Sequence, residues 1–147
     1  MKRIWAPLTA LAFAALAPVG NGPAAAADPS GIWINAEGDT KIRVSRCGEG
    51  ICGTVAWLAD PTGADGKPKT DRHNANPAQR GRRLIGVPVL LDMKPNGTDK
   101  WSGRIYNADD GKTYISYVTL SSADTINVQG CVLGGLLCKS MAWTRSN

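Results

Sequence analysis

The two ends of the strand-like part of this chain carry residues that can meet in space. Gly31 and Trp33 open the first strand-like run, and Arg145 shares one face of the last run with Trp143, because side chains alternate along a strand. If the two runs pair, the Arg145 guanidinium can lie on the Trp33 ring in a cation–π contact worth about 0.5–2 kcal/mol, and Gly31 allows the close approach. Such a contact would close a sheet into a barrel. The alternative is an ordinary core tryptophan and a solvated terminal arginine.

Alternating runs and tight turns occupy most of the chain between these ends. Residues 41–46 alternate polar and apolar side chains, which is typical of a half-buried strand, and Asn96-Gly97 and Asp110-Gly111 are strong hairpin signals. No segment after the N-terminal region has the pattern of a convincing amphipathic helix. The sequence therefore predicts an all-β fold, an antiparallel up-and-down barrel of about eight strands. Two packed sheets are the competing architecture, and a barrel of this size is either filled by side chains or holds one small ligand.

The alternation also assigns side chains to faces in two of the runs. One face of the run at 51–57 carries Ile51, Gly53, Val55 and Trp57. In the run at 101–106, one face carries Trp101, Gly103 and Ile105, and the other carries Arg104 and Tyr106. We take the glycine-bearing face of each run as the inner one, so both tryptophans are expected inside the barrel.

One long segment, at about residues 60–83, interrupts this regularity. It holds three prolines and three glycines and few apolar side chains, and it shows no periodicity. An irregular loop of this length is uncommon in a compact domain and is often functional or mobile. The apolar run that follows, at 84–91, contains Gly86 and Pro88, and it is expected to be an edge or bulged strand because proline cannot donate to a β-ladder.

The first 27 residues have the features of a secretory signal peptide. A positively charged start is followed by an apolar run from Leu8 to Leu16 and by the A-x-A cleavage pattern at Ala25–Ala27. The apolar run is too short to span a bilayer; a retained membrane anchor is the alternative. Cleavage leaves residues 28–147, a single domain. We therefore expect the protein in the periplasm or secreted, with no membrane span.

All four cysteines lie after the cleavage site, so disulfides are the expected state in an exported chain. Cys47 and Cys52 flank one apparent hairpin turn and Cys131 and Cys138 flank another, which favours two local bridges, Cys47–Cys52 and Cys131–Cys138. A zinc site is the alternative. The export signal and the tight apolar turns argue against it, and we expect no metal and no cofactor.

Short motifs spread over nearly all of the chain after residue 27 carry a family resemblance. The first-strand Gly-x-Trp with a last-strand arginine is similar to the closure signature of the lipocalin and avidin group, the calycins. The further motifs are Cys47–Gly53, Asp65–Pro68, Thr70-Asp71, Asn76-Pro77 with Arg80, Gly86–Leu90, Trp101–Gly103, Ile105-Tyr106, Asp110–Tyr114, Gly130-Cys131 and Trp143–Arg145. Together they resemble the bacterial domain-of-unknown-function 2147 family. The resemblance implies an exported lipocalin-like barrel and no established activity, and a barrel fold by itself does not fix function.

The sequence offers little support for catalysis. His73 is the only histidine and lies in the long segment beside Asp71, but no serine is near it in sequence and the cysteines are expected to be bridged. A calcium loop ending at Asp65-Gly66 would need acids or amides at two positions that hold Pro61 and Gly63. We therefore expect a protein that is not an enzyme.

Aromatic and basic side chains are the candidates for binding a small ligand. Arginine side chains suit carboxylates and phosphates, and large amphipathic rings suit a barrel interior or its opening. The candidate residues are Trp57, Trp101, Tyr114, Tyr117, Arg80, Arg82 and Arg83. They would hold a lipid-like or anionic amphipathic ligand. The alternative is that the arginines pair with nearby aspartates or tie the loop to the barrel.

Residues 132–137, Val-Leu-Gly-Gly-Leu-Leu, form an apolar hairpin tip between two cysteines. They either present a surface patch to an envelope or protein partner or pack back over the barrel. The formal net charge is +5, and the leader residues Lys2 and Arg3 supply two of these charges, so a nucleic-acid partner is not expected. The sequence leaves two hypotheses: a carrier of a small apolar or amphipathic ligand, or an envelope interaction module with a filled barrel. A carrier needs a pocket of roughly 300 Å³ or more. The oligomeric state is not indicated.

Overall fold

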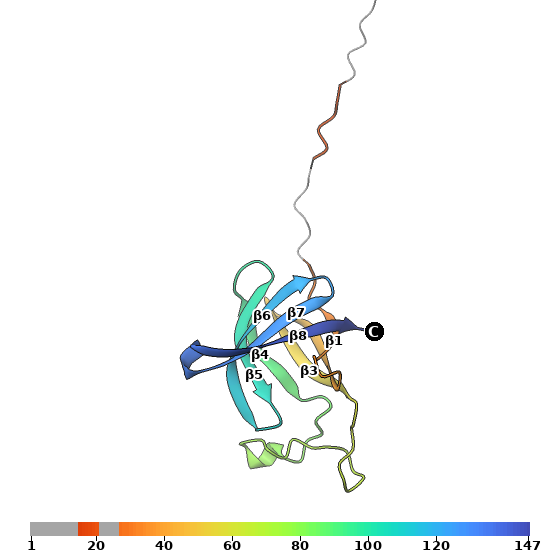
Figure 1. Cartoon of the computed structure of the whole chain (residues 1–147), viewed down its shortest axis with the longest axis vertical. Helices are drawn as coiled ribbons and strands as arrows, with labels where there is room; N and C mark the ends of the chain where they lie inside the picture. The colour runs from red at the N-terminus through yellow and green to blue at the C-terminus, as the bar shows by residue number, and fades with distance from the viewer. Residues whose placement is uncertain (1–14, 21–26) are drawn as a thin grey trace, which may run out of the picture.

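The computed structural model describes residues 15–20 and 27–147, and the predicted signal peptide lies largely outside the described residues. The chain forms a closed antiparallel barrel in which each strand pairs with its neighbours in sequence and the last pairs with the first (Figure 1). The strands are β1 Gly31–Ile34, β2 Thr40–Cys47, β3 Gly50–Leu58, β4 Pro88–Pro95, β5 Lys100–Asn107, β6 Lys112–Ser122, β7 Thr125–Val132 and β8 Leu137–Ser146. This confirms the predicted up-and-down barrel of eight strands over the two-sheet alternative.

The interior of the barrel is filled by apolar side chains. Every strand contributes at least one buried residue to a single core cluster, among them Trp33, Ile42, Val44, Val118, Ile126 and Val128. The alternation seen in the sequence places them there, since inward residues recur at every second position. Two short 3₁₀ turns, η1 Pro77–Gln79 and η2 Leu133–Gly135, complete the fold. In the described part of the chain, helices are too short to reach across a bilayer.

The antiparallel order divides the connections between two ends of the barrel. One end of the barrel holds Arg145, and we call it the closed end. It carries the β2–β3, β4–β5 and β6–β7 turns. The opposite end, which we call the loop end, carries the β1–β2, β5–β6 and β7–β8 turns and the long β3–β4 connection. In Figure 1 the long connection lies below the barrel, and the residues directly before β1 lie at the top.

A bulge in β3 changes the predicted direction of Trp57. Lys41 pairs with Trp57 while the next residue, Ile42, pairs with Val55, so Ala56 is the extra residue that shifts the register. Trp57 therefore lies on the outer surface, with 41% of its area exposed and the Lys41 ammonium 5.3 Å from its ring centroid. The prediction that Trp57 shares the face of Val55 was wrong, because strict alternation fails at a bulge.

β4 is bulged, as the glycine and proline of the run at 84–91 predict, although the strand itself begins only at Pro88. Its pairing with β3 and its pairing with β5 both shift register, and the shift against β5 falls between Leu91 and Lys94. Gly103 on β5 fits this bulge, since a Cβ there would lie 2.6 Å from the carbonyl oxygens of Leu91 and Asp92. Pro88 pairs with Thr54 at the start of the strand, where a missing donor is tolerated.

Candidate functional site

A buried carboxylate holds the long β3–β4 connection, residues 59–87, against the loop end. Asp71 is fully buried and accepts hydrogen bonds from the Tyr106 hydroxyl at 2.6 Å, from Asn74 Nδ2 at 2.9 Å and from Arg82 Nε at 2.9 Å. Arg82 Nη2 lies 2.8 Å from the same carboxylate. Because Tyr106 belongs to β5 and the other three residues belong to the loop, this cluster ties the loop to the barrel wall.

The same cluster sets the titration of its two central groups. Burial raises the pKa of Asp71, but the hydrogen bonds from Tyr106, Asn74 and Arg82 and the charge of Arg82 outweigh it, so the pKa lies below the ordinary 3.8. Burial, followed by the hydrogen bond to Asp71 and the Asp71 charge, raises the pKa of Tyr106 above 10.0. Asp71 is therefore charged and Tyr106 is neutral at physiological pH.

Further backbone contacts order the loop. Asp71 N donates to the Arg82 carbonyl at 2.9 Å, and Leu84 N donates to the Lys69 carbonyl at 3.0 Å, so the two limbs of the loop lie side by side. The loop also reaches the β5–β6 turn, where Gly111 has φ +71° and a Cβ would overlap the His73 carbonyl oxygen. The loop is thus held both to itself and to the end of the barrel.

The three candidate arginines lie in this loop, and two of them are occupied within it. Arg82 pairs with Asp71, and Arg80 Nε donates to the Asn74 carbonyl at 2.8 Å. Arg83 is exposed and forms an isolated bridge with Thr70. Arg82 therefore takes part in the cluster that ties the loop to the barrel, whereas Arg80 and Arg83 contact other residues of the loop.

The candidate aromatic residues do not gather around one pocket. Trp101 is buried in the core, and Trp57 lies on the outer surface of β3. The Tyr114 hydroxyl bonds to Asp110 at the loop end, and Tyr117 is half-exposed on the outer surface of β6. The structure therefore brings these four side chains to separate parts of the barrel.

At the closed end, Arg145 spans the seam between the first and last strands. Trp33 pairs with Arg145, and the guanidinium carbon lies 4.3 Å from the Trp33 ring centroid. The guanidinium also donates to the carbonyls of Ala123 at 2.8 Å, Ser30 at 2.8 Å and Asp28 at 3.1 Å. A Cβ on Gly31 would lie 2.6 Å from Arg145 Nη1, which explains the glycine.

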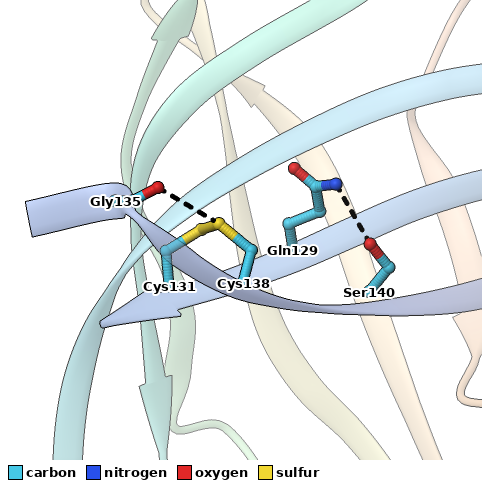
Figure 2. Close-up of a disulfide and its surroundings, with 5 residues drawn as sticks. All are labelled: Gln129, Cys131, Gly135, Cys138 and Ser140. Atoms are coloured by element: carbon cyan, nitrogen blue, oxygen red, sulfur yellow. Dashed lines mark hydrogen bonds between the residues drawn. A yellow bond between two sulfur atoms is a disulfide. The ribbon is translucent and has the colours of Figure 1, made fainter. Parts of the chain in front are cut away.

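Both disulfides have the pairing predicted from the sequence, Cys47–Cys52 and Cys131–Cys138. Figure 2 shows the second one bridging β7 and β8 just before the turn of the hairpin, where Cys138 Sγ lies 3.5 Å from the Gly135 carbonyl oxygen. A Gln129–Ser140 hydrogen bond of 3.0 Å joins the same two strands. The apolar tip, residues 132–137, extends beyond this bridge.

Two hollows stand out on the molecule, and both open to its outer surface. The larger, of about 590 Å³, lies between the β5–β6 and β7–β8 hairpins and is lined by Ala75, Gly111–Ile115 and Cys131–Gly134. The smaller, of about 370 Å³, lies over the irregular β3–β4–β5 region and is lined by Cys52–Thr54, Pro88, Leu90–Asp92 and Arg104. Neither hollow contains Arg80, Arg82, Arg83, Trp57, Trp101 or Tyr117; Tyr114 lines the larger.

The groups capable of chemistry are dispersed in the described part of the chain. His73 is exposed and its Nε2 accepts a hydrogen bond from Arg72 at 3.1 Å. Within residues 15–20 and 27–147, no three side chains of the histidine, cysteine, aspartate or glutamate type come together as metal ligands. Two polar atoms in the barrel wall, Ser116 Oγ and Trp143 Nε1, are buried without a hydrogen-bond partner.

Sequence reasoning missed the role of Asp71. It treated Asp71 as a possible partner of His73 and placed Tyr106 only by its strand face. Alternation placed Tyr106 on the face opposite Trp101 and Ile105, but the structure buries its ring in the core cluster. The available signal was a phenol at the end of a strand together with an acidic residue in a polar loop, because a buried tyrosine hydroxyl usually finds a hydrogen-bond partner.

Similarity to known proteins is consistent with this architecture. Residues 31–145 match a family model described as "Uncharacterized protein conserved in bacteria (DUF2147)". No curated protein matches the chain. The structure of a Helicobacter pylori protein described as belonging to the lipocalin family is similar, with a TM-score of 0.70 and 24% sequence identity, and the match covers 82% of this chain and 84% of that one. The barrel is therefore lipocalin-like in fold.

Proposed function

We propose that this chain, which belongs to the DUF2147 family of proteins conserved in bacteria, is an exported, non-enzymatic binding module that acts through its outer surface. The observation that carries the proposal is the filled barrel. Its core takes side chains from every strand, and the long loop is bonded across the end at which a ligand would enter an open barrel. A partner would therefore bind to the outer surface of the barrel.

Export is supported by the N-terminal sequence and by the two disulfides. A charged start, a short apolar run and an A-x-A pattern precede Asp28, and both cysteine pairs are bridged. A new N-terminus near Asp28 would keep the contacts of Arg145 with the carbonyls of Asp28 and Ser30. Export would place the module in the periplasm or outside the cell.

The non-enzymatic part of the proposal is supported by what the polar groups already do. All four cysteines are bridged, Asp71 is bound by three side chains of the loop and wall, and His73 is exposed beside Arg72. Nucleophilic catalysis needs a free nucleophile held by an oriented base, and these groups do not provide that pair.

Cell fractionation tests export directly. The full chain is expressed in a bacterium with a periplasm, and the mature protein is isolated and its N-terminal sequence determined. We expect the protein in the periplasmic fraction with a start near Asp28, and oxidised cysteines. An intact chain that remains in the cytoplasm with reduced cysteines would overturn the proposal.

A small-ligand carrier is the second candidate function, and the larger hollow favours it. Its volume of about 590 Å³ exceeds the roughly 300 Å³ that small-molecule sites need, although the hollow is open rather than enclosed. Native mass spectrometry of the protein from its own periplasm separates the two functions. A surface module is expected at the mass of the bare chain, whereas a carrier is expected with a lipid-sized adduct.

A further inference from the structure

The apolar tip of the β7–β8 hairpin is an exposed aliphatic surface. Leu133, Leu136 and Leu137 have 72%, 88% and 62% of their areas exposed, and Val132 is half-exposed beside them. No polar side chain lies between Cys131 and Cys138. Turns normally carry polar side chains because they face water, so four exposed aliphatic residues at one turn need an explanation.

The tip is held in a fixed shape that projects from the barrel. β7 and β8 pair without interruption from Thr125–Thr144 to Val132–Leu137, and the Cys131–Cys138 bridge closes the hairpin just before the tip. Figure 1 shows this hairpin extending past the barrel wall. Leu136 N donates to the Leu133 carbonyl within the turn, so part of the backbone of the tip is already satisfied.

We propose that the tip docks this protein on a phospholipid bilayer, with its aliphatic side chains entering the boundary between headgroups and acyl chains. Burial of apolar area drives such interfacial binding, and a paired hairpin brings few unsatisfied backbone groups into the apolar region. The proposal deepens the proposed function, on which it rests, by naming the partner of the outer surface.

The residue types at the tip favour lipid over a protein partner. Protein–protein hot spots are enriched in tryptophan, tyrosine and arginine, and leucine and valine are under-represented there. Insertion into lipid requires only apolar side chains, and the side chains of the tip are all apolar. Tyr117 lies directly behind the tip, with its hydroxyl 3.6 Å from a Cβ placed on Gly135, and tyrosine is enriched at membrane–water interfaces.

Two lysines near the tip suit an anionic membrane. The only charged residue that lines the hollow behind the tip is Lys112, and the first charged residue after the tip is Lys139. In the part of the chain that the structure describes, neither lysine forms an ion pair. Asp109 and Asp110 occupy the neighbouring turn, so we expect a moderate preference for anionic lipid rather than a steep one.

Vesicle co-sedimentation tests the proposal. The full chain is expressed in a bacterium that exports it. The purified protein is mixed with vesicles that contain phosphatidylcholine and phosphatidylglycerol in a ratio of about two to one. Leu136→Ser removes the most exposed leucine of the tip. Ile85→Ser is the matched control, because Ile85 is an aliphatic residue of the long loop with 46% of its area exposed. Both sites are exposed enough for the fold to persist, which circular dichroism verifies.

We expect the wild type and Ile85→Ser to bind alike and Leu136→Ser to bind about tenfold more weakly. Vesicles of phosphatidylcholine alone are expected to bind the wild type severalfold more weakly, since each lysine near the surface favours anionic lipid. Absence of wild-type binding, or equal binding by Leu136→Ser and the wild type, overturns the proposal. A dimer that is lost in Leu136→Ser also overturns it, because the tip would then bind a second copy.

A second readout reports where the tip lies. Fluorescence of Leu136→Trp is expected to be quenched by phosphatidylcholine brominated on its acyl chains more strongly than fluorescence of Ile85→Trp. Equal quenching overturns the proposal. If the vesicle and quenching experiments fail, the proposed function as a surface binding module is still supported when the chain is exported and a photo-crosslinker at position 136 captures an envelope protein in cells. Cytoplasmic retention removes the proposed function itself.

Discussion

The guanidinium carbon of Arg145 lies 4.3 Å from the ring centroid of Trp33 and joins the last strand of the barrel to the first. Trp33 is fully buried, and its indole nitrogen donates to the Pro29 carbonyl at 2.8 Å. Arg145 thus stacks on a fixed ring and binds three backbone carbonyls at once. The pair completes the sheet and also fastens the segment that precedes β1 across the closed end.

Replacing Arg145 should therefore destabilise the whole barrel. Arg145→Gln loses a cation–π contact of about 0.5–2 kcal/mol and hydrogen bonds worth about 1 kcal/mol each, so we expect the free energy of unfolding to fall by about 2–4 kcal/mol. Arg43→Gln is the control, since Arg43 is exposed on β2 and its guanidinium forms no ion pair within the described residues. Equal urea midpoints for the two variants would refute the closure role.

The strand order and the seam were accessible from the sequence for a simple reason. Alternation and turn-forming residues act locally, so Asn96-Gly97 and Asp110-Gly111 mark hairpins without knowledge of the rest of the chain. The pairing of Cys131 with Cys138 is local in the same sense. Once the strands form a meander, the first and last are the only ones left to pair.

Long-range or irregular features were not accessible in this way. The bulge at Ala56 turns Trp57 outward, and nothing in the local pattern marks that extra residue. Asp71 and Tyr106 are 35 positions apart, and their contact depends on how the loop folds back over the wall. The four candidate aromatic residues were chosen by type, and the structure places them in separate parts of the barrel, with Trp101 in the core.

Gly111 should tolerate no side chain. Gly111→Ala places a methyl group against the His73 carbonyl and forces a residue other than glycine to φ +71°, so we expect a loss of about 2 kcal/mol or more and faster proteolysis of the long loop. Gly48→Ala is the matched control, because Gly48 has φ +60° and nothing within 4 Å of its Cβ position. If both variants lose the same free energy, backbone strain alone explains the loss and the contact with His73 contributes nothing.

The bridge at the base of the tip should contribute stability in a measurable way. Removing Cys131 and Cys138 together, as the double alanine variant, should lower the free energy of unfolding by about 2–3 kcal/mol, because the unfolded chain gains freedom. Alkylation of the denatured wild type should add no label before reduction and four labels after it, since all four cysteines are bridged. Labels added without reductant would show that the bridges do not form in the isolated protein.

Tyr106→Phe tests the attachment of the loop to the wall. It removes the hydroxyl that donates to Asp71 at 2.6 Å and keeps the buried ring, so we expect a loss of about 1–2 kcal/mol. Because the pKa of Tyr106 is raised on folding, its contribution is complete below pH 10 and disappears as the pH rises through the folded-state pKa. Tyr117→Phe, at a half-exposed ring, should unfold like the wild type. The comparison is made by urea unfolding at pH 7.

The charge on Asp71 should make stability depend on pH in the acid range. Its pKa is lower in the folded chain than the ordinary 3.8, so its contribution is fully present above that value and is lost as the pH falls through the folded-state pKa. Asp71→Asn keeps the shape but gives up the charged acceptor, and we expect it to lose about 1–3 kcal/mol at pH 7, since one partner of a mostly buried pair remains. The difference between the variant and the wild type should stay constant from pH 7 to about pH 5 and shrink below pH 4. Asp65→Asn, in the exposed part of the same loop, should show no such convergence. A wild-type advantage that persists unchanged at pH 2 would mean that Asp71 acts through its shape rather than its charge.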